Sequence, residues 1–372
     1  MADRNKKELS RRAFLKTLGL AGVTLTGMPS FAKKIDGILG GNNVPKDIPI
    51  GKMTYRINSN SGDKTSLLGY GCMRWPMIDK PDGSGKIVNQ EAVNKLVDYA
   101  IAHGVNYFDT SPVYLQKQSE TATGIALSRY PRNSFYLATK MSNHWIAKSG
   151  KKGEELYQAS VDMYHHSFEA LQTDYFDYYL IHNVGFENRG LPFLKERIFN
   201  NKLIDFLLDE RKAGRIRNLG FSYHGETKEV FEYLLSRHDE IHWDFAQIKM
   251  NYFDYRHAAN VDLTAEHLYN ELTKRNIPVI IMEPLLAGRL ASLPNDLNNS
   301  LKQARPDESV ASWAFRFAGS FSNVFTVLSG MTYMEHLQDN LRTYSPFTSC
   351  TEDELTLLEN IAQEIAHQNS GD

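Results

Sequence analysis

The stretch FDYYLIH, residues 176–182, is a short run of aromatic and aliphatic side chains that ends on a histidine. Two earlier stretches have the same form. YFDTSPVY (107–114) carries Asp109 and Tyr114, and FYLATK (135–140) ends on a lysine. Runs of this length and composition predict buried β-strands. Each of these four polar residues therefore lies at or just after the carboxyl end of a predicted strand.

The same pattern continues along the chain, where short apolar runs alternate with longer helix-like runs. The predicted strands are LLGYGCM (67–73), VNYFD (105–109), FYLATK (135–140), FDYYLIH (176–182), IRNLGFS (216–222), FAQIKM (245–250), PVIIME (278–283) and VFTVLSG (324–330). The predicted helices are Glu91–His103, Glu120–Ser128, Glu154–Leu171, Leu194–Ala213, Thr227–Arg237, Thr264–Arg275, Ser309–Phe317 and Met334–Arg342. Eight strands alternating with helices favour an α/β fold of the (β/α)8 TIM-barrel type.

The alternative is a doubly wound open sheet, which requires a glycine-rich turn that opens the first helix. The segment LGYGC has Gly69 and Gly71, but it lacks both a third glycine and an immediate helix, so it is a poor dinucleotide fingerprint. Before the first strand, MTYRI and the turn NSNSGDK predict one β-hairpin at the floor of the barrel. A last helix, Glu352–His367, is expected to pack outside it.

The first segment has the form of an export signal. SRRAFLK (10–16) contains a pair of arginines, an apolar stretch follows, and Ser30 and Ala32 are small residues before a cut after position 32. The paired arginines indicate the twin-arginine export machinery as a partner, and therefore an exported, periplasmic protein. The alternative is an ordinary basic start to the first domain. The expected organisation is a signal (1–32), a linker (33–52) and the barrel (53–372).

Composition excludes several classes of function. The chain has 372 residues, a formal net charge of −2 and 42% hydrophobic residues, which gives no nucleic-acid footprint. Cys72 and Cys350 form neither a disulfide framework nor a CxxC metal site. The segment RHDEIH (237–242) lacks the spacing of a zinc protease, so no metal is expected. No stable membrane span is expected in the mature protein.

Asp109, Tyr114, Lys140 and His182 together suggest proton transfer. A lysine ammonium near the phenol is expected to lower the tyrosine pKa by ~1–3 units, and Asp109 would keep that lysine charged. The imidazole adds a donor that orients a carbonyl and stabilises charge on its oxygen. Taken singly, each residue also has a structural interpretation, such as a helix cap, a rim lysine, a surface aromatic or a core histidine. Because all four residues are predicted at the same rim, the catalytic interpretation is favoured, with a nicotinamide supplying the hydride.

These blocks resemble the aldo-keto reductase superfamily, from about Leu67 to Asn340. DTSPVY resembles its Asp-Thr-x-x-x-Tyr block, LATK and LIH its lysine and histidine blocks, and LGFSYH with the glutamine of FAQIKM its carboxamide block. The segments GCMRWP, IMEPLLAGRL and VLSGM resemble a bacterial subgroup of twin-arginine-exported predicted oxidoreductases. Many of its members end in a ferredoxin-like segment, which this chain lacks, so no iron–sulfur cluster is expected.

The resemblance implies an NAD(P)H-dependent oxidoreductase that interconverts a carbonyl and an alcohol, with Tyr114 as general acid and base. It assigns these residues to the cofactor: Gly71, Cys72, Met73, Ser222, Gln247, Met282, Pro284, Leu285, Gly288, Arg289, Ser329, Gly330, Met331, His336, Asp339 and Asn340. Two positions depart from the family pattern. Met282 replaces an aromatic that stacks on the nicotinamide, and Tyr223 replaces an asparagine. The family favours NADP, but 331–338 lacks Lys and Arg, so NAD is the alternative.

Two other functions remain open. One is a nucleotide-binding, redox-sensing barrel with little turnover, and the other is a barrel isomerase or lyase. The partner in the leading hypothesis is a small carbonyl or alcohol. The expected substrate walls are Trp75, Met77, Trp145, Phe186, Arg189, Tyr252, Tyr255 and Arg256. Their mixture of aromatic and basic side chains suggests a polar, sugar-like or acidic compound.

Overall fold

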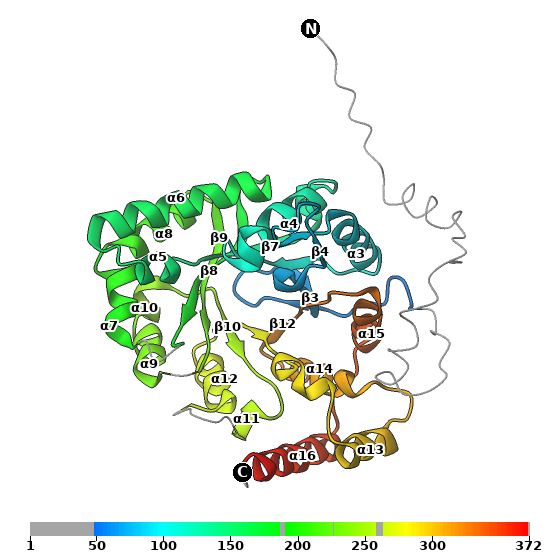
Figure 1. Cartoon of the computed structure of the whole chain (residues 1–372). Helices are drawn as coiled ribbons and strands as arrows, with labels where there is room; N and C mark the ends of the chain where they lie inside the picture. Colours follow the sequence, from blue (N-terminus) through cyan, green and yellow to red (C-terminus); the bar gives the residue numbers. More distant parts are fainter. Residues whose placement is uncertain (1–47, 187–189, 226, 258–262, 371–372) are drawn as a thin grey trace. The chain divides into compact units, whose positions relative to one another are not determined.

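The computed structural model describes residues 48–186, 190–225, 227–257 and 263–370. In this part of the chain eight parallel strands close into a barrel with helices around it (Figure 1). The barrel strands are β3 (Leu68–Gly71), β6 (Tyr107–Asp109), β7 (Tyr136–Met141), β8 (Phe176–Val184), β9 (Ile216–Tyr223), β10 (Phe245–Lys249), β11 (Val279–Met282) and β12 (Val324–Ser329). They follow one another in chain order, and β12 closes on β3. The predicted (β/α)8 barrel and its eight strands are confirmed.

Long helices cover the outside of the barrel. They are α3 (Gln90–Ala102), α4 (Ser119–Leu127), α6 (Gly153–Leu171), α8 (Leu203–Lys212), α9 (Lys228–Ser236), α12 (Ala265–Lys274), α13 (Asn295–Ala304), α14 (Val310–Gly319) and α15 (Met334–Tyr344). Shorter turns join them to the strands: η1 (Cys72–Arg74), η2 (Tyr114–Lys117), η3 (Arg132–Ser134), α5 (His144–Lys148), α7 (Leu191–Leu194), η4 (Lys195–Phe199), α10 (His238–Ile241), α11 (Asp254–His257) and η5 (Leu286–Ala291).

One predicted helix is wrong. The apolar pattern predicts a single helix over Leu194–Ala213, whereas the structure has α7, the π-helical turn η4 and only then α8. The break comes at Lys202, which has a left-handed backbone (φ 63°). The helix was predicted from the spacing of apolar residues alone, and that spacing gives no sign that an arginine within the segment is buried. Arg197 is that residue, and it is 1% exposed.

The barrel interior and the layer outside it form separate hydrophobic cores. The interior is filled by Tyr107, Ala138, Tyr178, Leu180, Phe245, Ile280, Phe325 and Leu328. A larger cluster lies between the strands and the helices. Strand β8 shows the alternation that separates them, because Tyr178 and Leu180 belong to the interior while Tyr179 and Ile181 belong to the outer layer. The same alternation decides which strand-end side chains point into the barrel mouth.

The predicted N-terminal hairpin is confirmed. Strands β1 (Tyr55–Ile57) and β2 (Lys64–Ser66) pair antiparallel and contact the amino-terminal end of the barrel. Tyr178 donates its phenol hydrogen to Asp63 Oδ2 at 2.8 Å, and Thr65 Oγ1 donates to the Phe325 carbonyl at 3.1 Å. These polar contacts satisfy groups at the barrel floor, so the hairpin closes the end opposite the predicted site.

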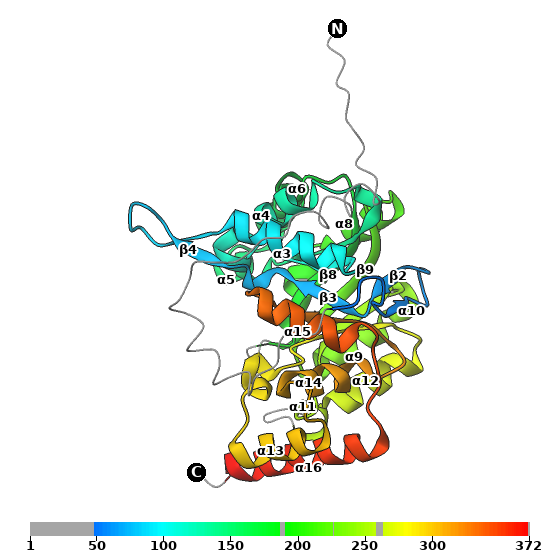
Figure 2. The same cartoon turned by 90° about the vertical axis from the view of Figure 1, so that its right-hand side faces the viewer.

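A second hairpin was not predicted from the sequence. Strands β4 (Met77–Asp79) and β5 (Lys86–Val88) pair antiparallel between β3 and α3. Figure 2 shows this hairpin standing out from the barrel. Ile78 and Ile87 face each other across it and are 49% and 44% exposed. Each strand has only three residues, which is too short for alternation to give a signal.

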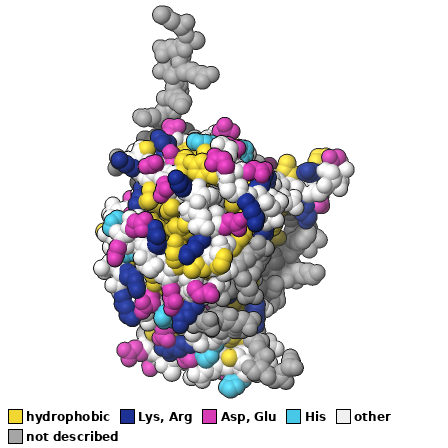
Figure 3. All heavy atoms as spheres, turned by 90° about the vertical axis from the view of Figure 1, so that its left-hand side faces the viewer, with side chains coloured by type: hydrophobic (Ala, Val, Ile, Leu, Met, Phe, Trp, Pro, Cys, Tyr) yellow, Lys and Arg dark blue, Asp and Glu magenta, His cyan; other side chains and the backbone are white. Residues whose placement is uncertain are grey.

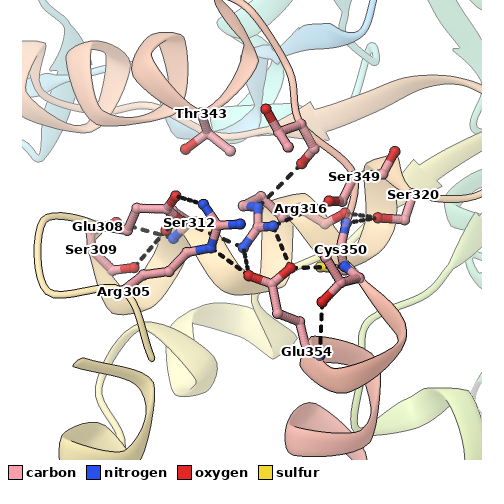
Figure 4. A network of polar contacts seen from close by, with 12 residues as sticks. Arg305, Glu308, Ser309, Ser312, Arg316, Ser320, Thr343, Ser349, Cys350 and Glu354 are labelled. Atoms are coloured by element: carbon pink, nitrogen blue, oxygen red, sulfur yellow. Dashed lines mark hydrogen bonds and ion pairs between the residues drawn. The ribbon is translucent and has the colours of Figure 1, made fainter. Parts of the chain in front are cut away.

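The predicted C-terminal helix is confirmed as α16 (Glu352–Ser370) and lies outside the barrel beside α13 (Figures 1 and 2). A polar network holds it there (Figure 4). Arg316 on α14 donates to Glu354 Oε2 at 2.6 Å, and Arg305 at the end of α13 pairs with the same carboxylate. Burial raises the pKa of Glu354, but the hydrogen bonds from both arginines outweigh it and lower the pKa to about 2.

The surface agrees with the small net charge. On the face drawn in Figure 3, basic, acidic and hydrophobic side chains are interspersed, and neither charge sign dominates among the described residues. No helix within the described ranges is both long and apolar enough to cross a membrane. The predicted export signal and residues 33–47 of the predicted linker lie outside the described residues. Ile48, also within that linker, is 8% exposed and belongs to the core.

Candidate active site

The four predicted catalytic residues lie together at the barrel mouth. Strands β6, β7 and β8 are neighbours, and they deliver Asp109, Lys140 and His182 from their carboxyl ends. Each side chain shares the inward direction of the interior residue two positions before it, namely Tyr107, Ala138 or Leu180. Tyr114 opens the turn η2, just after β6. The alternation of strand side chains therefore explains why three of the four converge.

Asp109 and Lys140 form a buried ion pair. Lys140 Nζ lies 2.5 Å from Asp109 Oδ1 and donates to the Thr110 carbonyl at 2.7 Å. Desolvation lowers the pKa of Lys140, but Asp109 and Tyr114 raise it above its ordinary value. Burial raises the pKa of Asp109, and the ammonium opposes that rise. At 2.5 Å each charge stabilises the other, so we take both groups as ionised at neutral pH.

Tyr114 lies beside this pair. Lys140 Nζ is 4.9 Å from the centre of the tyrosine ring. Burial raises the pKa of Tyr114, and the nearby ammonium only offsets part of that rise. The predicted net lowering of this pKa is therefore wrong, because desolvation of the phenolate outweighs the attraction of the lysine. The phenol is protonated at neutral pH, which is the form that can act as an acid.

His182 is held by two serines that the sequence reasoning missed. Ser142 Oγ lies 2.6 Å from His182 Nδ1, Ser111 Oγ lies 3.4 Å from it, and the two hydroxyls are 2.8 Å apart. Burial and several nearby cations lower the pKa of His182 well below its ordinary value, so the ring is neutral. When Ser142 donates to Nδ1, the proton of the ring is on Nε2. The ring packs edge-on against Tyr114, with centroids 5.7 Å apart.

Three predicted cofactor residues meet on the other side of the mouth. Ser222 Oγ and Gln247 Nε2 contact the sulfur of Met282 at 3.6 and 3.4 Å. Gln247 is 2% exposed, and its Oε1 has no hydrogen-bond partner in the part of the chain that the structure describes. A buried amide oxygen without a donor fits a ligand that brings its own N–H, as a carboxamide does. Tyr223 points away from this group and donates to the Thr227 carbonyl, so the departure at this position leaves the pocket intact.

The predicted pyrophosphate segment forms a tight turn after β11. Left-handed backbone at Glu283, Leu286 and Ala287 (φ 53°, 48° and 55°) bends the chain back on itself. Leu286 and Leu290 are buried and anchor the turn. Pro284 is buried and Leu285 partly so, while Gly288 and Arg289 are exposed. The turn therefore presents a guanidinium and backbone groups at the rim, which suits phosphate oxygens.

The predicted adenosine residues follow β12. Asn340 Nδ2 donates to Ser329 Oγ at 2.9 Å, and Asp339 Oδ2 accepts from Ser309 Oγ at 2.6 Å. Gly330 and His336 are exposed at the same rim.

The remaining predicted cofactor residues, which lie in or next to η1 and just after β12, differ in exposure. Met73 is exposed at the rim. The Cys72 and Met331 side chains are fully buried in the core, so a nucleotide at the rim could reach only their backbone. Gly71 allows the end of β3 to lie close to the end of β12, because a Cβ added at Gly71 would lie 3.3 Å from the Ser329 carbonyl.

Comparison with known proteins agrees with this geometry. The family model described as "Aldo/keto reductase family" matches residues 68–363. The chain belongs to the aldo/keto reductase family. Membership makes it an NAD(P)-dependent oxidoreductase that acts on carbonyls and alcohols. The finer assignment to an exported subgroup stays a prediction.

The chain is similar to two named dehydrogenases and to the solved structure of another aldo-keto reductase. L-galactose dehydrogenase of Arabidopsis thaliana is 26% identical and covers 83% of this chain and 93% of that protein. D-arabinose 1-dehydrogenase of Saccharomyces cerevisiae is 32% identical over 37% of this chain and 41% of that protein. An aldo-keto reductase of Klebsiella pneumoniae, solved in complex with NADPH, has a TM-score of 0.61 at 21% identity, covering 83% and 96% of the two chains.

Several predicted substrate walls of the reductase lie elsewhere. Trp75 is 2% exposed and donates to Thr123 Oγ1 at 3.0 Å, so it is a packing residue. Tyr252 is also buried, Tyr255 packs on Phe317, and Arg256 pairs with Glu266. These positions follow a strand in sequence, but Trp75 and Tyr252 are buried in the core, and Tyr255 and Arg256 contact other helices.

The remaining predicted walls are nearer the mouth. Trp145 on α5 is 56% exposed, and the Phe186 ring packs at a tilt against His224 after β9. Met77 begins β4 and is partly buried. Arg189 lies outside the described residues. Within those residues no group of three or more His, Cys, Asp or Glu side chains is placed to hold a metal ion.

Glu120 is a buried acid behind the catalytic strands of the reductase. It lies on α4, is 2% exposed, and accepts from Thr139 Oγ1 at 2.5 Å. Burial raises its pKa to about 7, against hydrogen bonds from Thr139 and Ser167. The folded protein therefore holds this proton more tightly than the unfolded chain, whose ordinary value is 4.5. Stability is lost as the pH rises from about 4.5 to about 7.

We expect Glu120→Gln to remove this loss, because the amide keeps the acceptor for Thr139 and never ionises. The variant should match the parent at pH 5 and exceed its free energy of unfolding at pH 8 by on the order of 2–3 kcal/mol. Urea denaturation at the two pH values measures this. Glu169→Gln, an exposed change on α6, is the control. An equal difference at both pH values would show that Glu120 is ionised throughout.

Proposed function

We propose that this aldo/keto reductase uses Tyr114 as general acid and base in hydride transfer between NADP(H) and a sugar-like carbonyl or alcohol. The observation that carries the proposal is the chain of contacts from Asp109 through Lys140 to Tyr114, with a neutral His182 against the phenol. Bound NADPH supplies the hydride. Every other step falls to side chains of this protein.

In the direction of reduction, the Tyr114 phenol gives its proton to the carbonyl oxygen as negative charge develops there. The phenolate that remains is stabilised by the ammonium of Lys140, which Asp109 keeps charged. His182, with its proton on Nε2, donates to the same oxygen and orients it. The raised pKa keeps the buried phenol protonated before reaction, and the cation next to it favours release of that proton by stabilising the phenolate.

A preference for NADP is supported by positive charge near the predicted adenosine residues. Burial raises the pKa of Asp339, and Arg342, Lys302 and His336 act against that rise, so all three lie near it. Within residues 331–338 only His336 is a candidate to contact a 2′-phosphate, but the fold brings Lys302 of α13 to the same region. A 2′-phosphate would gain from the positive charges of Lys302 and Arg342. The Klebsiella pneumoniae structure contains NADPH.

A sugar-like substrate is supported by the named relatives, which are an L-galactose and a D-arabinose dehydrogenase. It is also supported by Trp145, which is 56% exposed on α5 next to His144, a residue that packs edge-on against His182. An indole can cover the apolar face of a sugar.

The test is a titration of tryptophan fluorescence with NADPH and NADH, followed by turnover assays on aldoses, aliphatic aldehydes and keto acids. We expect quenching by both nucleotides, tighter binding of NADPH, and the fastest turnover on aldoses. In Arg342→Ala the preference for NADPH should narrow. No quenching by either nucleotide would favour an isomerase or lyase, whereas tight binding without turnover would favour a redox-sensing barrel.

We further propose that the reductase is exported through the twin-arginine route, on the strength of SRRAFLK (10–16) and the apolar stretch after it. Lysines in place of Arg11 and Arg12 should leave the protein in the cytoplasmic fraction, while the parent reaches the periplasm. Cell fractionation with an antibody to the barrel measures this. An unchanged distribution in the double variant would contradict the route.

A further inference from the structure

We propose that Arg197 is a positioning residue of the active site, because its buried guanidinium holds the bulged end of β8 that carries His182. The inference rests on the proposed role of His182 in orienting the substrate oxygen. Neither the sequence pattern nor the comparisons point to this arginine. The structure singles it out by its burial and by the atoms that it contacts.

Arg197 is an unusual residue to bury. It is 1% exposed, and within the described residues no carboxylate pairs with it. Desolvation lowers its pKa to about 9, which still leaves it charged at neutral pH. Burial of an uncompensated cation is costly unless hydrogen bonds offset it. Arg197 also lies in η4, the π-helical turn where the predicted helix is broken, and such turns often occur at functional sites.

The guanidinium binds two strand ends at once. Its Nη2 donates to the His182 carbonyl at 2.9 Å and to the Asn183 carbonyl at 3.4 Å. Its Nη1 donates to Asn143 Oδ1 at 2.8 Å, and Asn143 Nδ2 donates back to the Arg197 carbonyl at 2.8 Å. Asn143 directly follows Ser142, the residue that holds the His182 ring. A planar fork can satisfy such divergent acceptors, which a lysine cannot.

The strand needs this support because it is irregular there. The pairing of β8 with β9 shifts register between Ile181 and Val184, so His182 and Asn183 together oppose one residue of β9. Asn183 has a left-handed backbone (φ 56°). A bulge re-aims the side chain next to it and takes its backbone groups out of the ladder. Arg197 donates hydrogen bonds to those carbonyls in place of the neighbouring strand. These bonds fix the strand end so that His182 is directed into the barrel mouth.

The charge of Arg197 also bears on the ring. The ionisable groups that face His182 are Lys140 from β7, His144 from α5, His224 after β9, Arg197 from η4 and Tyr114 from η2. After burial, Lys140 lowers the pKa of His182 most, followed by His144, His224 and Arg197. Removal of the guanidinium charge should therefore raise that pKa. Two effects follow for a variant, one of geometry and one of charge.

Two substitutions separate these effects. Arg197→Lys keeps the charge but loses the fork, so kcat should fall about tenfold to a hundredfold with KM changed less than about twofold, and the acid limb of the pH profile should stay in place. Arg197→Met loses both, so the same fall in kcat should come with an acid limb moved to higher pH. Steady-state kinetics from pH 4.5 to 8 on the full chain provide these readouts.

The control is Arg132, which binds the other end of the same strand. It donates to the Tyr175 carbonyl at 2.8 Å and pairs with Asp177 at 2.7 Å, far from the mouth. Arg132→Met should lower stability without changing kcat or the acid limb. The proposal is overturned if the Arg197 variants behave like this control. It is also overturned if Arg197→Lys restores full activity, which would mean that charge alone matters.

A readout without turnover keeps the two proposals apart. In spectra of protein with ¹⁵N-labelled histidine, a His182→Gln variant identifies the His182 signals. We expect these signals to move in Arg197→Met, both in titration and in tautomer, and to stay in Arg132→Met. If the parent turns over no carbonyl, the proposed function fails but this measurement still decides the role of Arg197. If Arg197→Met does not fold, Arg197→Lys serves in both experiments, where its His182 tautomer should change.

Discussion

Tyr114→Phe is expected to reduce kcat for carbonyl reduction by roughly 10²–10⁴-fold, because the phenol is the only proposed proton donor to the substrate oxygen. The change removes a single oxygen atom and keeps the ring that packs on His182. NADPH affinity should stay within about twofold, since the hydride donor is bound by other residues. Stopped-flow reduction and fluorescence titration on the same sample measure the two quantities.

Tyr107→Phe is a matched control for this experiment. Tyr107 lies on β6, the strand just before Tyr114, and points into the barrel, but its buried phenol oxygen has no hydrogen-bond partner among the described residues. Loss of that oxygen should leave kcat unchanged. If Tyr114→Phe reduces carbonyls as fast as the parent, another group supplies the proton, and the assignment of Tyr114 is wrong.

The second large effect is expected from Asp109→Asn. This change leaves the fully buried ammonium of Lys140 without its counter-ion at 2.5 Å. Removal of one partner of a buried ion pair costs on the order of 3–5 kcal/mol, so the free energy of unfolding should fall by about that amount. Activity should fall as well, because Lys140 can then lose its proton and no longer stabilise the Tyr114 phenolate. Urea denaturation at pH 7 measures the first effect, and steady-state kinetics the second.

The double variant Asp109→Asn with Lys140→Met tests the reason for this loss. Without either charge the penalty of an unpaired ion disappears, so the double variant should be less destabilised than the sum of the two single variants. Glu91→Gln, which breaks the exposed pair with Lys95, should show no measurable change in stability. Additive losses at positions 109 and 140 would mean that the buried pair contributes no coupling.

Much of the site could be predicted because strand-end positions are local in sequence. Asp109, Lys140 and His182 each close an apolar run, and the alternation of side chains sends all three inward. Tyr114 follows at a fixed short distance. The serines that hold His182 were missed, although Ser142 also follows a strand end. A lone serine is too common to carry a prediction, and its contact with a histidine 40 positions away appears only in the folded barrel.

Arg197 could not be predicted for the same reason. It lies in an apolar pattern that reads as one helix, and its role depends on carbonyls of a strand 14 and 15 positions earlier. The unpredicted hairpin β4–β5 shows a different limit, because strands of three residues are too short for an alternation of period two to be recognised. Trp75 and Tyr252 show a third limit of prediction from sequence. A position just after a strand does not determine whether the side chain lines the rim or packs in the core.

The sequence by itself determined the barrel and the quartet, because repeated apolar runs fix the strands and their alternation fixes the direction of each side chain. Only the tertiary structure decided the protonation states. The Tyr114 phenol has a raised pKa and His182 a lowered one because burial removes the water that would stabilise either charged form. Burial is a property of the assembled barrel, to which residues far apart in the chain contribute, and no local pattern records it.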